Sequence, residues 1–404
     1  NCSVTNMSIG NVINFLANQN PADILCLGSR SGKMTYVLNE LERLRPDKFN
    51  KTSVYASISD NSSGGVTEPT NSTAIFTTFD GSKGLERKIC VVFDYTEEYW
   101  GSRKRKPDTK YEILRNIFCV AMSRGKEQII VVSSPTIKTL SDETISKPFA
   151  MNKNYIRPFN VNDMFDFKYD EDIEDCYALI RTRKSRVSDK TVINVELADG
   201  MIDLSPCIGI YQEVSFFKKY DINQQIKYSL NIYNDRPAMK LKPNATVEEK
   251  VLFLTAHETN QERYYCQVKP PFVTESQMNA IHERLKTKFT GDETVQDNFS
   301  MLVVDNDNDR YFINGRPDVI KNKTIYELKF VNELEHKHFL QCACYMVAFG
   351  LKKGILWNTK TNEQYTITIP DEGIFIEAVM KTVTKGKAKR SYIQDRMMEE
   401  NIAS

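Results

Sequence analysis

Short apolar segments that alternate with a helical pattern dominate residues 1–145. ADILCLGS, AIFTTFD, KICVVFDY and EQIIVVSS each have the length of one strand. KMTYVLNELERL follows the first of them with the spacing of a helix, because Val37, Leu38 and Leu41 share one face. Strands that are apolar on both faces are typical of a parallel sheet covered by helices on each side. The pattern therefore predicts an α/β domain with a parallel sheet over residues 1–148.

The remainder of the chain falls into two further regions. Residues 149–245 are less regular, and KTVINVELADGMIDLSPCIGIYQEVSFF indicates strands and turns, so we expect a mixed α+β linker or accessory domain there. Residues 246–404 begin with two helical patterns and continue with three antiparallel strands, whose turns are DNDND and KNK. A helix that ends at Gly350 and a closing hairpin follow. We therefore expect three consecutive domains, 1–148, 149–245 and 246–404.

The charge balance limits how this chain can bind a nucleic acid. Lys and Arg total 54 against 53 Asp and Glu, a net charge of +1, so contact with phosphates requires local basic patches. One candidate patch is the run Arg103, Lys104, Arg105 and Lys106, although such runs are more often solvated faces. The absence of any run of 18 apolar residues excludes a membrane-spanning helix, and nine scattered cysteines are typical of reduced thiols in a cytoplasmic protein.

The strongest chemical pattern is a set of three charged residues on one expected hairpin. Glu327 and Lys329 are two residues apart on a strand, so they face the same side, and Asp318 lies near the end of the partner strand. Two carboxylates from neighbouring strands are suitable oxygen ligands for Mg²⁺ or Mn²⁺. A metal there would activate water and stabilise charge on a phosphate, and Lys329 would orient the nucleophile. The tripeptide ELK alone is common, and the alternative is an exposed strand with ordinary charges.

The next helix adds a polar pair. Gln341 and Tyr345 are four residues apart and therefore share one helix face, where they are placed to contact a DNA backbone near the metal. With Gly315, the order G-x-x-D, E-L-K and Q-x-x-x-Y resembles the RecB-like branch of the PD-(D/E)XK nucleases over residues 250–365. The resemblance implies a nuclease domain with a central mixed sheet. It also implies that the Asp and the Glu hold the metal, the Lys assists the water, and the Gln/Tyr pair supports DNA.

Members of that family often add a histidine from an upstream helix to the metal site. His282 in MNAIHERL resembles the family's helical G-x-x-x-H-x-x-L segment without its glycine, and we prefer it as the third ligand. His257 is the alternative, and an exposed helix histidine is the ordinary interpretation of each. HKHFLQCAC contains zinc-ligand types, but residues two apart on a helix diverge, so we expect no structural zinc. No cysteine follows Cys344, so we expect no iron–sulfur cluster of the kind that some relatives carry.

Two segments of the first region resemble motifs V and VI of UvrD-like superfamily 1 helicases. TTFDGSKGLE matches the first motif with an aspartate in place of its histidine, and VAMSRGK matches the second. The resemblance implies the second RecA-like domain of a motor. We expect Gly84, Glu86 and Arg124 to bind nucleotide, and Thr78 and Lys83 to bind nucleic acid. Without the resemblance, an arginine at the end of a helix is simply favoured by the helix dipole.

The chain lacks the sequence signs of a complete motor. LGSRSGKMT has three residues instead of four between its first glycine and Gly-Lys, and Met34 follows the lysine, so it is not a Walker A motif. We therefore expect no ATP hydrolysis by this chain alone, and ATP binding only if a missing N-terminal motor domain or a partner helicase subunit completes the site. The sequence predicts a Mg²⁺- or Mn²⁺-dependent deoxyribonuclease, the C-terminal part of a helicase–nuclease that processes DNA ends in replication, recombination or repair. The alternative is a non-catalytic DNA-binding or scaffold fragment of a superfamily 1 translocase.

Overall fold

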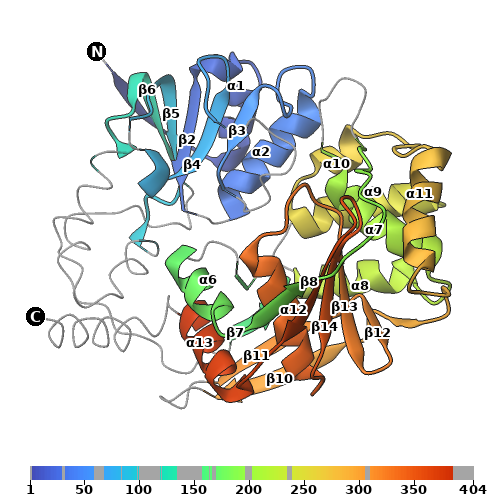
Figure 1. The fold of residues 1–404 in the computed structure, drawn as a ribbon. Coiled ribbons are helices and arrows are strands. Elements are labelled where there is room, and N and C mark those ends of the chain that lie inside the picture. Colours follow the sequence, from blue (N-terminus) through green and yellow to red (C-terminus); the bar gives the residue numbers. More distant parts are fainter. Residues whose placement is uncertain are drawn as a thin grey trace, which may run out of the picture. The chain divides into compact units, whose positions relative to one another are not determined.

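In the computed structural model the chain forms two compact units, each of which is described by itself (Figure 1). The structure describes residues 2–29, 32–58, 68–82, 84–97, 99, 119, 121–133, 157–162, 164–165, 170–195, 203–233, 239–304 and 310–384. The first unit comprises residues 1–151, 196–204 and 225–272, and the second comprises 152–195, 205–224 and 273–404. Each unit thus combines segments that are distant in the sequence, whereas we expected three consecutive domains.

The first unit is built on a parallel sheet with the strand order β1-β6-β5-β2-β4-β3. The strands are β1 (Ser3–Met7), β2 (Ile24–Gly28), β3 (Val54–Ala56), β4 (Ala74–Thr78), β5 (Arg87–Val92) and β6 (Gly125–Val132), with short 3-10 helices η1 (Pro21–Asp23) and η2 (Asp80–Ser82). On β2, Ile24 and Cys26 join one hydrophobic cluster with α1 (Ile9–Leu16) and α2 (Gly32–Leu44). Leu25 and Leu27 join a second cluster. Burial of both faces explains the continuous apolar sequence and confirms the predicted parallel sheet.

Helices from the middle of the chain complete the first unit. Most of α8 (Ile222–Ile232) belongs to it, together with α9 (Val247–Thr259) and α10 (Arg263–Cys266). Arg263 on α10 forms a buried ion pair with Glu42 on α2, with Nη2–Oε1 and Nε–Oε2 distances of 2.9 and 3.1 Å. Because removing either partner would leave a buried charge unpaired, this pair holds α10 firmly against α2. We had expected residues 246–272 to lie in the C-terminal domain.

The second unit contains a mixed sheet with the order β8-β15-β14-β13-β12-β9 and a smaller sheet with the order β10-β11-β7. The strands are β7 (Arg157–Asn160), β8 (Arg181–Lys184), β9 (Thr294–Val295), β10 (Phe299–Val304), β11 (Arg310–Gly315), β12 (Val319–Lys321), β13 (Thr324–Lys329), β14 (Gly354–Asn358) and β15 (Glu363–Thr368). β13 and β14 are parallel, and β12 pairs with β13 as the predicted hairpin. Asn322 and Lys323 form its turn with φ angles of 50° and 56°, so both adopt the left-handed conformation.

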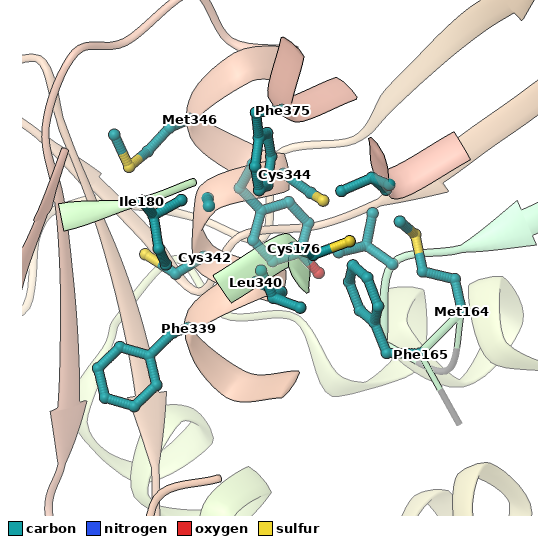
Figure 2. Packing of buried hydrophobic residues seen from close by; sticks show 14 of the residues in the cluster. Met164, Phe165, Cys176, Ile180, Phe339, Leu340, Cys342, Cys344, Met346 and Phe375 are labelled. Carbon is teal, nitrogen blue, oxygen red and sulfur yellow. The ribbon is translucent and has the colours of Figure 1, made fainter. Parts of the chain in front are cut away.

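The core of the second unit surrounds α12 (His336–Ala348), as Figure 2 shows. α6 (Asp170–Tyr177) contributes Cys176 to this core, and α13 (Glu372–Thr384) contributes Phe375. Gly354 allows β14 to approach α12 closely, because a Cβ there would lie 2.6 Å from Met346 Sδ and 2.8 Å from Cys342 Sγ. Helix α12 and strand β14 are therefore in direct contact.

One expectation for the middle of the chain is wrong. The segment that we interpreted as strands and turns contains the helix α7 (Ser205–Phe216), which packs against α11 (Glu275–Lys286). Its Ile and Val residues favour strands locally, but Cys207, Ile208 and Gln212 are fully buried, so tertiary packing outweighs local preference. None of the nine cysteines, all of which lie in the described part of the chain, forms a disulfide. Within the described residues, every helix is too short or too polar to cross a bilayer.

Candidate active site

The β12–β13 hairpin places the three charged residues of the sequence pattern together. Asp318 immediately precedes β12, and its Oδ2 accepts the backbone N–H of Leu328 at 2.6 Å. Glu327 and Lys329 leave the same face of β13, and Lys329 Nζ donates to Glu327 Oε1 at 2.9 Å. Both carboxylates are buried, whereas Lys329 is half-buried. The hairpin pairing alone therefore brings two carboxylates and an ammonium group to one place.

A third carboxylate reaches this group from α7. Gln296, which follows β9, donates its Nε2 to Glu213 Oε2 at 2.7 Å and to Asp318 Oδ1 at 3.2 Å. Gln296 has a φ of 54°, and its backbone N–H also donates to the carbonyl oxygen of Asp318 at 3.2 Å. The left-handed backbone and this bond fix the amide between the two carboxylates. We did not predict Glu213 or Gln296; the available signal was one glutamate within the apolar run of residues 205–217.

The electrostatics of the cluster follow from its burial. Burial raises the pKa of Asp318 well above its ordinary value, and the charge of Glu327 raises it further, against the opposing effect of Lys329. Burial and the charge of Asp318 likewise raise the pKa of Glu213, and burial raises that of Glu327. Burial alone would lower the pKa of Lys329, but the neighbouring carboxylates raise it above its usual range. A cation at this cluster would favour the ionised carboxylates.

A second layer of hydrogen bonds holds the end of β13 against α7. Thr359, just after β14, donates its backbone N–H to the carbonyl oxygen of Lys329 at 2.7 Å. The Thr359 hydroxyl lies 2.6 Å from Gln212 Oε1 and 3.0 Å from the same carbonyl oxygen. Gln212 precedes Glu213 in α7, so these bonds fix the helix that carries the third carboxylate relative to the strand that carries Lys329.

Gln341 and Tyr345 lie on one face of α12, as predicted, but they do not reach solvent together. Tyr345 is fully buried, and its hydroxyl donates to Asn162 Oδ1 at 2.7 Å. Gln341 Nε2 donates to the same oxygen at 2.8 Å. Gly315 makes room for the ring, because a Cβ there would lie 2.7 Å from Tyr345 Cε1. We expected this pair to contact DNA directly; in the structure both side chains hydrogen-bond to Asn162, which is exposed.

The structure does not bring either candidate histidine to the carboxylates. His282 on α11 lies against α7, where its Nε2 is 2.9 Å from Ser215 Oγ and its ring contacts Phe216. His257 belongs to the first unit, where its Nδ1 is 2.8 Å from Ser229 Oγ. In both cases the helix directs the imidazole toward a serine on a neighbouring helix. The expectation of a third ligand from His282 is therefore corrected, and among the described residues no histidine completes a group of three ligands with Asp318 and Glu327.

The donor set of the cluster fits a hard divalent cation. Glu327 Oε2 is buried and has no hydrogen-bond partner in the part of the chain that the structure describes, although its own Oε1 is paired. Such an oxygen lacks a compensating interaction unless an ion or water supplies one. Among the described residues no three His, Cys, Asp or Glu side chains converge on a metal position. Mg²⁺ commonly uses one or two carboxylates and retains water ligands, so Asp318 and Glu327 suffice.

The helicase-like residues lie at two ends of the parallel sheet of the first unit. Thr78 ends β4, whereas Glu86 and Arg124 directly precede β5 and β6 at the opposite edge. Glu86 pairs with Lys126 at 3.2 Å, and Arg124 Nε is buried without a hydrogen-bond partner among the described residues. Gly84, which lies between Thr78 and Glu86 in the sequence, has a φ of 82°. The structure thus brings Glu86 and Arg124 to one edge and leaves Thr78 at the other.

Some predicted residues lie elsewhere. The candidates Lys83, Arg103, Lys104, Arg105 and Lys106 fall outside the described residues. In HKHFLQCAC, His336 binds Glu174 at 2.8 Å and the two cysteines are buried in the core.

Comparison with known proteins identifies the region around the carboxylates. Residues 282–368 match the model of the PD-(D/E)XK nuclease superfamily. None of the curated proteins compared with the chain matches it. The C-terminal domain of a possible DNA helicase from Lactobacillus plantarum WCFS1 is 16% identical, with a TM-score of 0.22 over 36% of this chain and 78% of that one. The protein SSO0001 is 18% identical, with a TM-score of 0.24 over 42% of this chain and 88% of that one. Residues 282–368, which carry Asp318, Glu327 and Lys329, therefore form a PD-(D/E)XK nuclease superfamily domain.

Proposed function

We propose that the second unit hydrolyses phosphodiester bonds of DNA with the help of Mg²⁺ or Mn²⁺. The observation that carries this proposal is the buried Glu327 Oε2, for which the described residues supply no hydrogen-bond partner. A carboxylate oxygen left in this state is suited to a cation, and the match to a superfamily of nucleases supplies the reaction class.

The residues of the cluster have distinct roles in this proposal. Asp318 and Glu327 would hold the cation, which when bound supplies Lewis-acid stabilisation of the charge that develops on the phosphate. Lys329 keeps its proton, because the carboxylates raise its pKa, so it orients water and stabilises negative charge at the phosphate. The Leu328 N–H fixes Asp318, and the Gln296 amide fixes Glu213 relative to Asp318.

We also infer a helicase context for the nuclease. In this proposal the first unit is the second RecA-like domain of a superfamily 1 motor, and the chain is the C-terminal part of a helicase–nuclease that processes DNA ends. Arg124 Nε, which has no hydrogen-bond partner among the described residues, supports a nucleotide phosphate at that edge of the sheet. ATP would bind there only when a first motor domain, from a preceding segment or a partner subunit, completes the site.

Cleavage of fluorescent single- and double-stranded DNA by the purified 404-residue chain tests the nuclease proposal. We expect cleavage with Mg²⁺ or Mn²⁺ and none with EDTA. Asp318→Asn, Glu327→Gln and Lys329→Met should each lower the rate by about 100-fold or more, since each acts in the transition state. Glu283→Gln on α11 is a matched control, because Glu283 is exposed and pairs only with Lys286 on its own helix in the bonds seen here.

Two results would refute this assignment. Metal-dependent cleavage that survives Glu327→Gln would place the active site elsewhere. DNA binding without cleavage under any divalent cation would favour the alternative, a non-catalytic DNA-binding scaffold. Circular dichroism and melting temperatures of each variant separate loss of chemistry from loss of fold.

A further inference from the structure

Asn162 is an exposed residue that the second unit holds in a single orientation. It lies just after β7, where its backbone N–H donates to Asn160 Oδ1 at 3.1 Å. The preceding Val161 N–H donates to the carbonyl oxygen of Asn314 on β11 at 2.9 Å. The backbone around Asn162 is thus tied to both β7 and β11 of the smaller sheet.

The side chain of Asn162 is fixed as firmly as its backbone. Its Oδ1 accepts one bond from Gln341 Nε2 at 2.8 Å and one from the Tyr345 hydroxyl at 2.7 Å. With Gln341 Nε2 and the Tyr345 hydroxyl as donors, the Asn162 atom that both contact acts as the acceptor oxygen. The Asn162 amino group therefore points away from α12. The residue is exposed, so an amino group on that side is accessible at the surface.

This donor is linked through Tyr345 to the chain segment that carries Asp318. The Tyr345 ring packs on Gly315, three residues before Asp318, and its hydroxyl contacts Asn162. Burial raises the pKa of Tyr345, and the charges of Glu327 and Asp318 raise it further, which is consistent with their proximity. A rigid neutral donor at this position can bind a phosphate oxygen next to the reacting phosphate without adding positive charge.

We propose that Asn162 donates a hydrogen bond to a backbone phosphate of DNA bound at the second unit, and that Gln341 and Tyr345 act as its positioning residues. This inference rests on the proposed function for the presence of DNA at the site. In this inference the Gln/Tyr pair does not contact DNA directly. The contact is made by Asn162, which lies about 180 positions earlier in the chain.

DNA affinity in EDTA tests the inference without requiring catalysis. Fluorescence anisotropy with a labelled single-stranded oligonucleotide would measure the dissociation constant of the full chain. Asn162→Ala should weaken binding about tenfold, as expected for a lost hydrogen bond to a charged group. Asn162→Asp retains an acceptor for Gln341 and Tyr345 but replaces the donor by a negative charge. It should bind more weakly still, with an unchanged melting temperature.

Two further measurements separate a phosphate contact from a structural role. Because a neutral donor releases no counterions, Asn162→Ala should weaken binding by the same factor at about 50 and 200 mM salt. Adding Tyr345→Phe to Asn162→Ala should cause no further loss, since Tyr345 acts through Asn162. Asn223→Ala, at an exposed asparagine of the same unit, serves as the control.

The outcomes distinguish this inference from the nuclease proposal. Wild-type affinity of Asn162→Asp, or failure of the wild-type chain to bind DNA, would overturn the role of Asn162. Additive losses in the double variant would overturn the positioning role of Tyr345. If Asn162→Ala weakens binding while no divalent cation supports cleavage, the inference stands and the nuclease proposal fails. If cleavage is metal-dependent and Asn162→Ala binds DNA normally, the nuclease proposal stands and the inference about Asn162 fails.

Discussion

Replacing Glu293 by glutamine tests how the second unit holds the turn that leads into β9. Glu293 Oε1 accepts the Thr290 N–H and the Lys321 ammonium, each at 2.9 Å, and Oε2 accepts the Gly291 N–H at 2.9 Å. The Glu293 side chain is 7% exposed. Burial alone would raise the pKa of Glu293, but these donors together lower it to about 2.

The magnitude and the sign follow from that pKa. An unfolded glutamate has a pKa of about 4.3, and each unit of difference corresponds to about 1.4 kcal/mol before solvent screening reduces it. We therefore expect the ionised carboxylate to stabilise the second unit by about 1–2 kcal/mol at pH 7. Because the folded-state pKa is the lower one, this stabilisation is complete above about pH 5 and is lost as the pH falls toward 2.

Urea unfolding at pH 7, 5, 4 and 3 would measure the effect. A Trp100→Phe background leaves Trp357, which is buried in the second unit, as the only tryptophan reporter. Glu293→Gln should lower the free energy of unfolding most at pH 7 and progressively less at lower pH, whereas Glu283→Gln should show no such trend. A loss for Glu293→Gln that is constant from pH 7 to pH 3, or absent at pH 7, would refute the reasoning.

Three other substitutions give separate checks. Asp318→Asn should raise the melting temperature in EDTA at pH 8 by a few degrees. The raised pKa means that ionised Asp318 destabilises the fold above its unfolded-state pKa, and a lower melting temperature would contradict this. His282→Ala should keep the Mn²⁺ concentration for half-maximal cleavage within about twofold, since the ring contacts Ser215; a tenfold rise would restore it as a ligand. Gly315→Ala should destabilise the second unit by about 1–3 kcal/mol in urea unfolding, because its methyl would overlap Tyr345, and an unchanged midpoint would show that the ring can move.

The parts of the site that the sequence could predict are those defined by local geometry. Glu327 and Lys329 share a strand face, and Asp318 is one hairpin turn away, so a strand pattern was enough to place them together. The parallel sheet was predictable for the same reason, because burial of both faces leaves a continuous apolar run in each strand.

The remaining parts depend on contacts between distant segments. The contacts of Glu213, Gln296 and Asn162 with the hairpin or α12 form only when the chain folds. Contacts between distant segments leave no periodic pattern in the sequence. Glu213 was harder still to find, because the Ile and Val residues around it favour a strand when taken alone. His282 was chosen because its segment matches a family pattern. Such a local match carries no information about which neighbouring element the helix contacts, and in the structure His282 contacts Ser215.

The interleaved segments of the two units have a consequence for how this protein can be divided or recombined. The chain leaves and re-enters the second unit around residues 195–205 and again around 224–273. A gene fragment that starts at residue 273 would encode Asp318, Glu327 and Lys329 but would lack α7 and β7, and with them Glu213 and Asn162. A single crossover upstream of residue 152 would transfer the complete second unit only together with residues 196–204 and 225–272, which belong to the first unit. Evolutionary exchange of this unit would require the intervening helices to travel with it, so the two units are expected to be inherited together.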